Sequence, residues 1–168
     1  MSGSPDGQAE FCARVGRRLV NALALYCGDR FVAEELAQEA LARALERWVE
    51  VSAMAAPEGW VYRTGVNLAR SRFRRAAIER RARARLGRAP RLPDTDEVVA
   101  VRQAVLALPE RQRAVIIARF YVGLDVAETA GALGCRPGTV QAHTFKALAN
   151  LRAAGFIDEE ETAHDRSG

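Results

Sequence analysis

Apolar residues recur at helical spacing along almost the whole chain, and this periodicity constrains the fold more than any other feature of the sequence. Between Phe11 and Ala154 there is neither a sustained alternation of apolar and polar residues nor an Asn-Gly or Asp-Gly hairpin signal. The pattern therefore predicts an all-α fold. Residues 1–8 and 158–168 are polar and lack this periodicity, so we expect both ends to be frayed tails.

Glycine and proline divide the periodic stretches into successive helices. Gly28 and Asp29 end the first stretch, and Pro57 followed by Glu58 marks the start of a long one. We expect helices over residues 11–27, 31–49, 57–85, 97–108, 109–121, 126–133 and 137–154.

One segment is typical of a linker. Residues 87–96 contain Gly87, Pro90 and Pro93 and no core-forming run. A chain of 168 residues can hold one medium domain or two small ones. With the boundary placed at this linker, we expect two small helical domains, residues 9–86 and 97–155.

Positive charge gathers in the middle of the chain. The net charge is +4, but residues 60–91 contain eleven arginines and a single acidic residue, Glu79, which gives that stretch a charge of +10. Such clustering is typical of a surface that binds a polyanion. The preference for arginine over lysine is less informative, because Lys146 is the only lysine of the chain.

Helical geometry places four polar residues of this basic stretch within about 40° of one another on one face. They are Arg63, Asn67, Arg70 and Arg74. Trp60 and Tyr62 stand at the start of the same helix, where an aromatic ring could stack on an unpaired base. For Trp60 a packing role in the core is the more common alternative, and it stays open.

Residues 126–140, V-A-E-T-A-G-A-L-G-C-R-P-G-T-V, have the pattern of a helix-turn-helix. Gly134 tolerates the positive φ of a tight turn, and Pro137 fits the first turn of the following helix. That helix would enter the major groove, and a plain αα-hairpin is the alternative. Its expected exposed residues, able to bond base edges or phosphates, are Thr139, Gln141, His143, Thr144 and Lys146.

Taken in order, the segments from about Phe11 to Arg152 resemble an extracytoplasmic-function (ECF) sigma factor of the sigma-70 family. F-V-A-E-E-L-A-Q-E-A-L, residues 31–41, resembles the part of region 2 that docks on the polymerase β′ clamp. The resemblance assigns that contact to Glu35, Leu36, Gln38 and Glu39. On its own, this acidic run would be read as a solvated surface.

Two further segments carry the resemblance. W-V-Y-R-T-G-V-N-L-A-R-S-R-F-R-R, residues 60–75, resembles the part of region 2 that reads and melts the minus-ten element, with Asn67 at the characteristic asparagine. L-P-E-R-Q-R-A-V-I-I-A-R-F, residues 108–120, and the helix-turn-helix after it resemble region 4. That region reads the minus-thirty-five element and contacts the β flap.

The recognition helix departs from the family pattern. It reads G-T-V-Q-A-H-T-F-K-A-L, where G-T-V-K-S-R with further arginines is usual, so several phosphate contacts are missing. Arg136 stands where a serine cap is common, which removes a side-chain acceptor worth about 1 kcal/mol. The resemblance still places Arg136 on the minus-thirty-five surface, and we expect weak or unusual recognition there.

Other classes of function lack their motifs. The sequence has no catalytic triad, paired-carboxylate motif or phosphate-binding glycine loop, so we expect no enzyme activity and no cofactor. Cys12, Cys27 and Cys135 are too widely spaced for a zinc site or a disulfide framework. Without a membrane span or signal peptide, the protein is expected to be cytoplasmic.

The resemblance implies several partners: core RNA polymerase, promoter DNA and an anti-sigma factor. Two alternatives stay open. One is a helix-turn-helix repressor or activator that binds duplex DNA by itself, with residues 11–59 as a dimerisation or sensor domain. The other is an interaction protein that binds polymerase without reading promoters.

Overall fold

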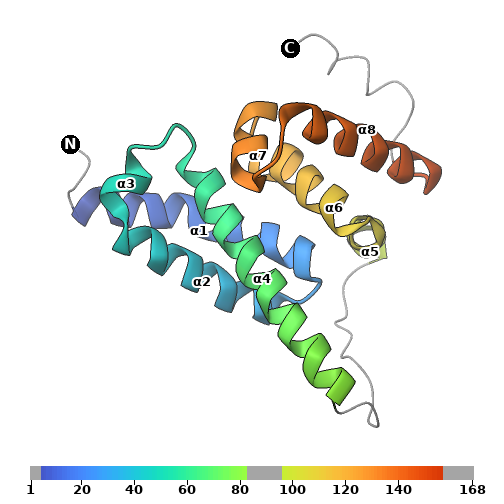
Figure 1. Ribbon diagram of the computed structural model, residues 1–168, viewed down its shortest axis with the longest axis horizontal. Coiled ribbons are helices and arrows are strands. Elements are labelled where there is room, and N and C mark those ends of the chain that lie inside the picture. Colours follow the sequence, from blue (N-terminus) through green and yellow to red (C-terminus); the bar gives the residue numbers. More distant parts are fainter. Residues whose placement is uncertain (1–4, 83–95, 157–168) are drawn as a thin grey trace.

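The computed structural model describes residues 5–82 and 96–156, and within these ranges it contains helices and turns but no strand (Figure 1). The elements are α1 (Pro5–Cys27), α2 (Arg30–Glu46), α3 (Trp48–Ser52), α4 (Pro57–Ala82), α5 (Asp96–Ala107), α6 (Glu110–Ile116), a π-helical turn η1 (Ile117–Val122), α7 (Val126–Leu133) and α8 (Pro137–Ala153). The predicted all-α fold is confirmed. All of the predicted linker except Asp96, the first residue of α5, lies outside the described residues.

Local chemistry sets the predicted helix ends. Gly28 follows α1 with φ +78°, and the Asp29 carboxylate accepts a hydrogen bond from the Val32 N–H at 3.1 Å as the N-cap of α2. Gly134 follows α7 with φ +65°, and Pro137 is the first residue of α8. The predicted tight turn between these two helices is therefore present.

The structure corrects two predicted boundaries near the N-terminus. α1 begins at Pro5, well before residue 11, because proline suits the first helical turn and Asp6 favours the positive end of the helix dipole. The predicted helix over 31–49 is broken at Arg47, whose φ of −113° and ψ of 29° are not helical. This break turns Trp48 into the core, where its ring centroid lies 5.2 Å from that of Phe11.

α1, α2 and α4 pack together around one apolar core. A close approach between α1 and α4 depends on Gly65, because a Cβ atom there would lie only 2.8 Å from Cδ1 of the fully buried Leu23. Around α2 the core is built from small residues, with Ala33, Ala37 and Ala40 almost completely buried. Small side chains on both sides allow α4 to lie close to its neighbours.

The same core continues into the C-terminal helices, α5–α8 with η1. Val105, Ile117 and Leu124 belong to the cluster that contains the buried residues of α1, α2 and α4. Figure 1 shows α6 and α7 beside the N-terminal half of α4, while the far end of α4 extends beyond its neighbours. The separate clusters of the C-terminal helices are small, centred on Ile116 and Val115. In this structure the two groups of helices therefore share most of their apolar core.

Candidate nucleic-acid interface

The predicted basic face of α4 lies at the surface. Arg63, Asn67 and Arg74 are exposed, whereas Val61 and Val66 on the other side of the helix are buried. This division follows from the helical repeat, because the apolar positions of α4 face α1 and α2. The polar face is therefore available to a polyanion except where other parts of the chain cover it.

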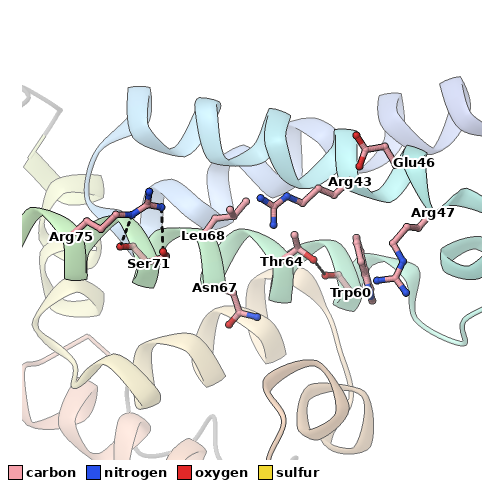
Figure 2. Close-up of a pocket in the computed structure, with 9 residues that line it drawn as sticks. All are labelled: Arg43, Glu46, Arg47, Trp60, Thr64, Asn67, Leu68, Ser71 and Arg75. Carbon is pink, nitrogen blue, oxygen red and sulfur yellow. Dashed lines mark hydrogen bonds between the residues drawn. The ribbon is translucent and has the colours of Figure 1, made fainter.

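A groove of about 550 Å³ runs between α2 and α4 (Figure 2). Its lining is rich in cationic and hydrogen-bonding side chains: Arg43, Glu46, Arg47, Trp60, Thr64, Asn67, Leu68, Ser71 and Arg75. Trp60 is partly buried, and the guanidinium carbon of Arg47 lies 5.8 Å from its ring centroid. This α2–α4 groove thus combines an aromatic surface with guanidinium groups, a combination that suits a nucleobase and its phosphate.

The two predicted aromatic residues differ in their surroundings. Tyr62 is fully buried and donates a hydrogen bond to the Ala114 carbonyl at 3.1 Å, so the suggestion that it could stack on a base was wrong. Its position on the buried side of α4 is the reason. Trp60 remains a candidate, and Figure 2 shows it at one end of the groove while Asn67 projects from α4 away from Arg43.

Arg70 is the one predicted residue of the basic face that has an acidic partner from another part of the chain. Its Nε lies 2.5 Å from Oε1 of Glu110 on α6, and the Tyr26 hydroxyl donates to the same oxygen at 3.0 Å. Burial opposes ionisation of Glu110, but the hydrogen bonds from Arg70 and Tyr26 outweigh it and lower the pKa of the carboxyl. Glu110 is therefore a charged acceptor for Arg70.

The second helix of the helix-turn-helix, α8, exposes only part of its predicted surface. Gln141 and Lys146 are exposed, and Thr139 and His143 are partly buried. Arg136 occupies the N-cap position and makes no side-chain capping bond, as its sequence position predicted. The exposed surface is thus weakly charged for a helix that meets DNA.

Thr144 was wrongly predicted to be exposed. It retains only 6% of its accessible surface, because it shares the core-facing side of α8 with Val140, Ala147 and Leu151. These residues follow one another at intervals of three and four, the spacing of a single helix face. Thr144 therefore supports the packing of α8 in this structure.

The sequence reasoning missed two residues of this region. Phe145 is 67% exposed on α8 beside the predicted polar residues, although a phenylalanine at helical spacing suggests core packing. Arg111 of α6 lines a small cavity of about 160 Å³ together with Arg70, Thr139 and His143. Its i+1 position after Glu110 gave no indication that it would face α4 and α8.

The predicted polymerase contact on α2 is an exposed acidic surface with one exception. Glu35, Gln38 and Glu39 are exposed. Leu36 is only 6% exposed because it belongs to the alanine-rich core face of the helix, so its assignment as a surface contact needs correction. It forms part of the wall of a neighbouring groove in which Glu35 pairs with Arg72.

The remaining chemistry of the described residues is limited. No group of three or more histidine, cysteine or acidic side chains is arranged to hold a metal ion in residues 5–82 and 96–156. Burial raises the pKa of the Cys27 thiol to about 12, so this cysteine is a poor nucleophile. In the same part of the chain, no helix has the length and apolar character required to cross a membrane.

Comparison with protein families matches both halves of the chain. Residues 11–78 match the model for sigma-70 region 2, and residues 99–151 match the model for sigma-70 region 4. These matches include the basic helix, the α2–α4 groove and the helix-turn-helix.

Individual proteins give the same result. The chain is 31% identical over 143 residues to the RNA polymerase sigma-E factor of Streptomyces coelicolor, covering 83% of this chain and 76% of that protein. It is 34% identical over 107 residues to the ECF RNA polymerase sigma factor SigM of Mycobacterium tuberculosis, covering 62% and 55%. The fold is similar to the sigma factor RpoE in its complex with the anti-sigma factor NepR from Bartonella quintana, with a TM-score of 0.77, 19% identity and coverage of 89% and 97%.

Proposed function

This chain belongs to the sigma-70 family as an ECF sigma factor, and on that premise we propose how its helices divide the work of promoter recognition. It binds core RNA polymerase and directs transcription from particular promoters. We assign no bond chemistry to it, so the work of the chain is binding alone. The proposed functional units are residues 9–86 for polymerase docking and the minus-ten element, and residues 97–155 for the minus-thirty-five element.

The α2–α4 groove is the proposed site for the minus-ten element. Trp60 offers a ring face for stacking on an unpaired base, and Asn67 offers an amide that can bond a base edge. Arg63, Arg70 and Arg74 would neutralise phosphates along the exposed face of α4. Because an unpaired base gains these contacts and a paired one does not, binding itself would favour melting.

The acidic surface of α2 is the proposed docking site for the β′ clamp of polymerase. Glu35, Gln38 and Glu39 would make this contact directly. Leu36 acts from beneath the surface, since its burial in the core holds the helix in place. Glu35 and Glu39 pair with Arg72 and Arg43 in the free chain, so docking would exchange these exposed pairs for intermolecular ones.

The helix-turn-helix is the proposed reader of the minus-thirty-five element. Gln141 can bond adenine through two hydrogen bonds, and Phe145 can contact a thymine methyl group. Arg136 and Lys146 would contact phosphates, and Thr139 and His143 would join them once they are uncovered. With so few cations on α8, the strong basic face of α4 has to supply much of the affinity for DNA.

A single observation carries this proposal: α4 presents an aromatic and guanidinium groove on a basic helix, in the same chain as a helix-turn-helix. The test is dependence on polymerase. The purified chain should give promoter-specific transcripts only with core polymerase. Tight, specific duplex binding by the chain alone would favour the repressor or activator instead.

Matched variants separate the two proposed tasks. Trp60→Ala and Asn67→Ala should reduce promoter opening more than tenfold while binding to core polymerase changes less than twofold. Glu39→Ala should reduce binding to core polymerase first. If all three variants affect both measurements equally, the division of tasks is wrong. A chain that binds polymerase but never supports transcription would be the interaction protein.

Cellular location and regulation are also proposals. A polymerase subunit works where the polymerase is, so we propose a cytoplasmic location. We also propose that an anti-sigma protein controls this chain, in keeping with the family and with the fold neighbour solved beside such a partner.

A further inference from the structure

The interface between the two groups of helices is extensive and specific. The Tyr62 hydroxyl of α4 donates to the Ala114 carbonyl of α6, and Arg113 of α6 donates to the Tyr26 carbonyl of α1 at 2.9 Å. On the other side of α1, Arg18 donates to the Tyr121 carbonyl at 3.0 Å. These bonds surround the shared apolar core, so the interface has the polar rim and apolar centre of a stable contact.

The same interface brings the two proposed DNA-reading surfaces together. Arg70 of α4 lines one small cavity with Thr139 and His143 of α8. The Arg63 guanidinium lies 3.8 Å from where a Cβ of Gly134, in the helix-turn-helix turn, would stand. The minus-ten and minus-thirty-five readers are therefore neighbours in this structure.

Promoter DNA requires the opposite arrangement. Positions minus ten and minus thirty-five are separated by 25 base pairs by definition, which is about 85 Å along a straight duplex. A major groove about 12 Å wide must also admit α8. Residues that line one cavity of about 160 Å³ cannot reach two such sites at once.

We propose that this interface is an autoinhibitory contact, in which the free chain is held closed with its two DNA-reading surfaces against each other until core polymerase separates them. Glu110 is the proposed latch. Its carboxylate occupies the guanidinium of Arg70, which the proposed function assigns to a DNA phosphate, and so it acts as an internal competitor for that phosphate. This inference rests on the proposed function for its consequence, but the closed contact itself can be measured separately.

An engineered disulfide can lock the closed arrangement. A Cβ atom at Gly59 would lie 3.6 Å from Cβ of Ala132, within the separation of about 3.5–4.5 Å that a disulfide requires. The variant carries Gly59→Cys and Ala132→Cys, with Cys135→Ser to prevent mispairing. Oxidised glutathione accepts the two electrons and two protons that the thiols lose.

The oxidised variant should form the 59–132 disulfide in most molecules and lose at least tenfold in promoter-specific transcription with core polymerase. Dithiothreitol should restore transcription to the level of the same variant kept reduced. A cross-linked chain that transcribes within twofold of its reduced form would overturn the proposal, as would failure of the two cysteines to pair. If the wild-type chain gives no transcript, the proposed function fails, while the yield of cross-linking still decides whether the closed contact forms.

A second variant tests the latch without a cross-link. Glu110→Gln keeps the size of the side chain but removes its charge, and it should lower the concentration needed for half-maximal transcription by about threefold, a modest change because the pair is partly exposed. Glu58→Gln is the matched control, because Glu58 pairs with Arg14 at 2.9 Å entirely within the N-terminal helices. Equal behaviour of the two variants would show that Glu110 is not the latch.

Discussion

Replacing Gly65 by alanine tests the close approach of α1 and α4 that positions the basic face. A Cβ atom at this position would lie 2.8 and 2.9 Å from the two Cδ atoms of Leu23, and Leu23 is fully buried and cannot move aside freely. Overpacking of this kind costs about 1–3 kcal/mol, and the better helix propensity of alanine offsets about 1 kcal/mol of it. The free energy of unfolding should therefore fall by about 1–2 kcal/mol.

Gly131→Ala provides the matched control. Gly131 lies inside α7, and a Cβ atom there would have no heavy atom within 4 Å outside its own surroundings in the helix. This variant should be more stable than the wild type by about 0.5–1 kcal/mol, since alanine replaces glycine without a clash. Two substitutions of the same kind should thus have opposite signs.

Urea unfolding followed by circular dichroism measures both variants on one scale. A change of 1 kcal/mol corresponds to about 2–4 °C in melting temperature for a chain of this size, so thermal melts give a second reading. If Gly65→Ala is as stable as the wild type or more stable, α1 and α4 are not packed as described, and the placement of the basic face loses its basis.

Three further predictions follow from other parts of the molecule. Asp125→Ala should lower stability by about 1 kcal/mol because Asp125 and Glu128 form a capping box on α7, whereas Arg136→Ser should raise it by up to about 1 kcal/mol by capping α8; urea unfolding of both checks the signs. Burial raises the pKa of Tyr26 to about 12 and that of Tyr62 as well. The stability that this burial represents is complete below pH 10.0, the ordinary pKa, and is lost as the pH rises toward about 12, so the free energy of unfolding should fall over that interval and fall less in Tyr26→Phe. Arg63→Ala and Arg74→Ala should each reduce the slope of log affinity against log salt for promoter binding by about 0.9, and an unchanged slope would show that these residues do not meet phosphates.

Local features of the fold were predictable from the sequence because their causes are local. Gly28, Gly134 and Pro137 each fix a backbone conformation by themselves, and the structure has a turn or a helix start at each of them. The capping box at Asp125 could also have been predicted, because Glu128 follows it at the required spacing. The break at Arg47 carries no such signal, since the packing of Trp48 against Phe11 is a tertiary contact.

Predictions for the site were less complete where exposure depends on packing between distant helices. The basic face of α4 follows from helical geometry, and Arg63, Asn67 and Arg74 are exposed on it as predicted. Thr144 and Leu36 were misplaced because each stands one position from an exposed polar residue and only the packing partner decides which faces inward. Contact roles for the site residues remain predictions.

The shared core could not be predicted from the sequence. Apolar residues such as Ile117 and Leu124 mark a buried face without naming the helices that cover it. Two sets of amphipathic helices can each close on themselves or can close on each other. The structure has the second arrangement, and the opening that we propose would expose part of this apolar surface for a partner to cover.

The central claim is that this chain gives core polymerase a new promoter specificity through two separate DNA contacts. The most direct measurement is run-off transcription with core polymerase and this chain on a library of random upstream sequences, followed by sequencing of the templates that yield transcripts. The account predicts two enriched elements at fixed positions, about 25 base pairs apart, of which Asn67→Ala weakens the downstream one and Gln141→Ala the upstream one. Transcripts that appear equally without the chain, or that show no enriched element, would contradict it.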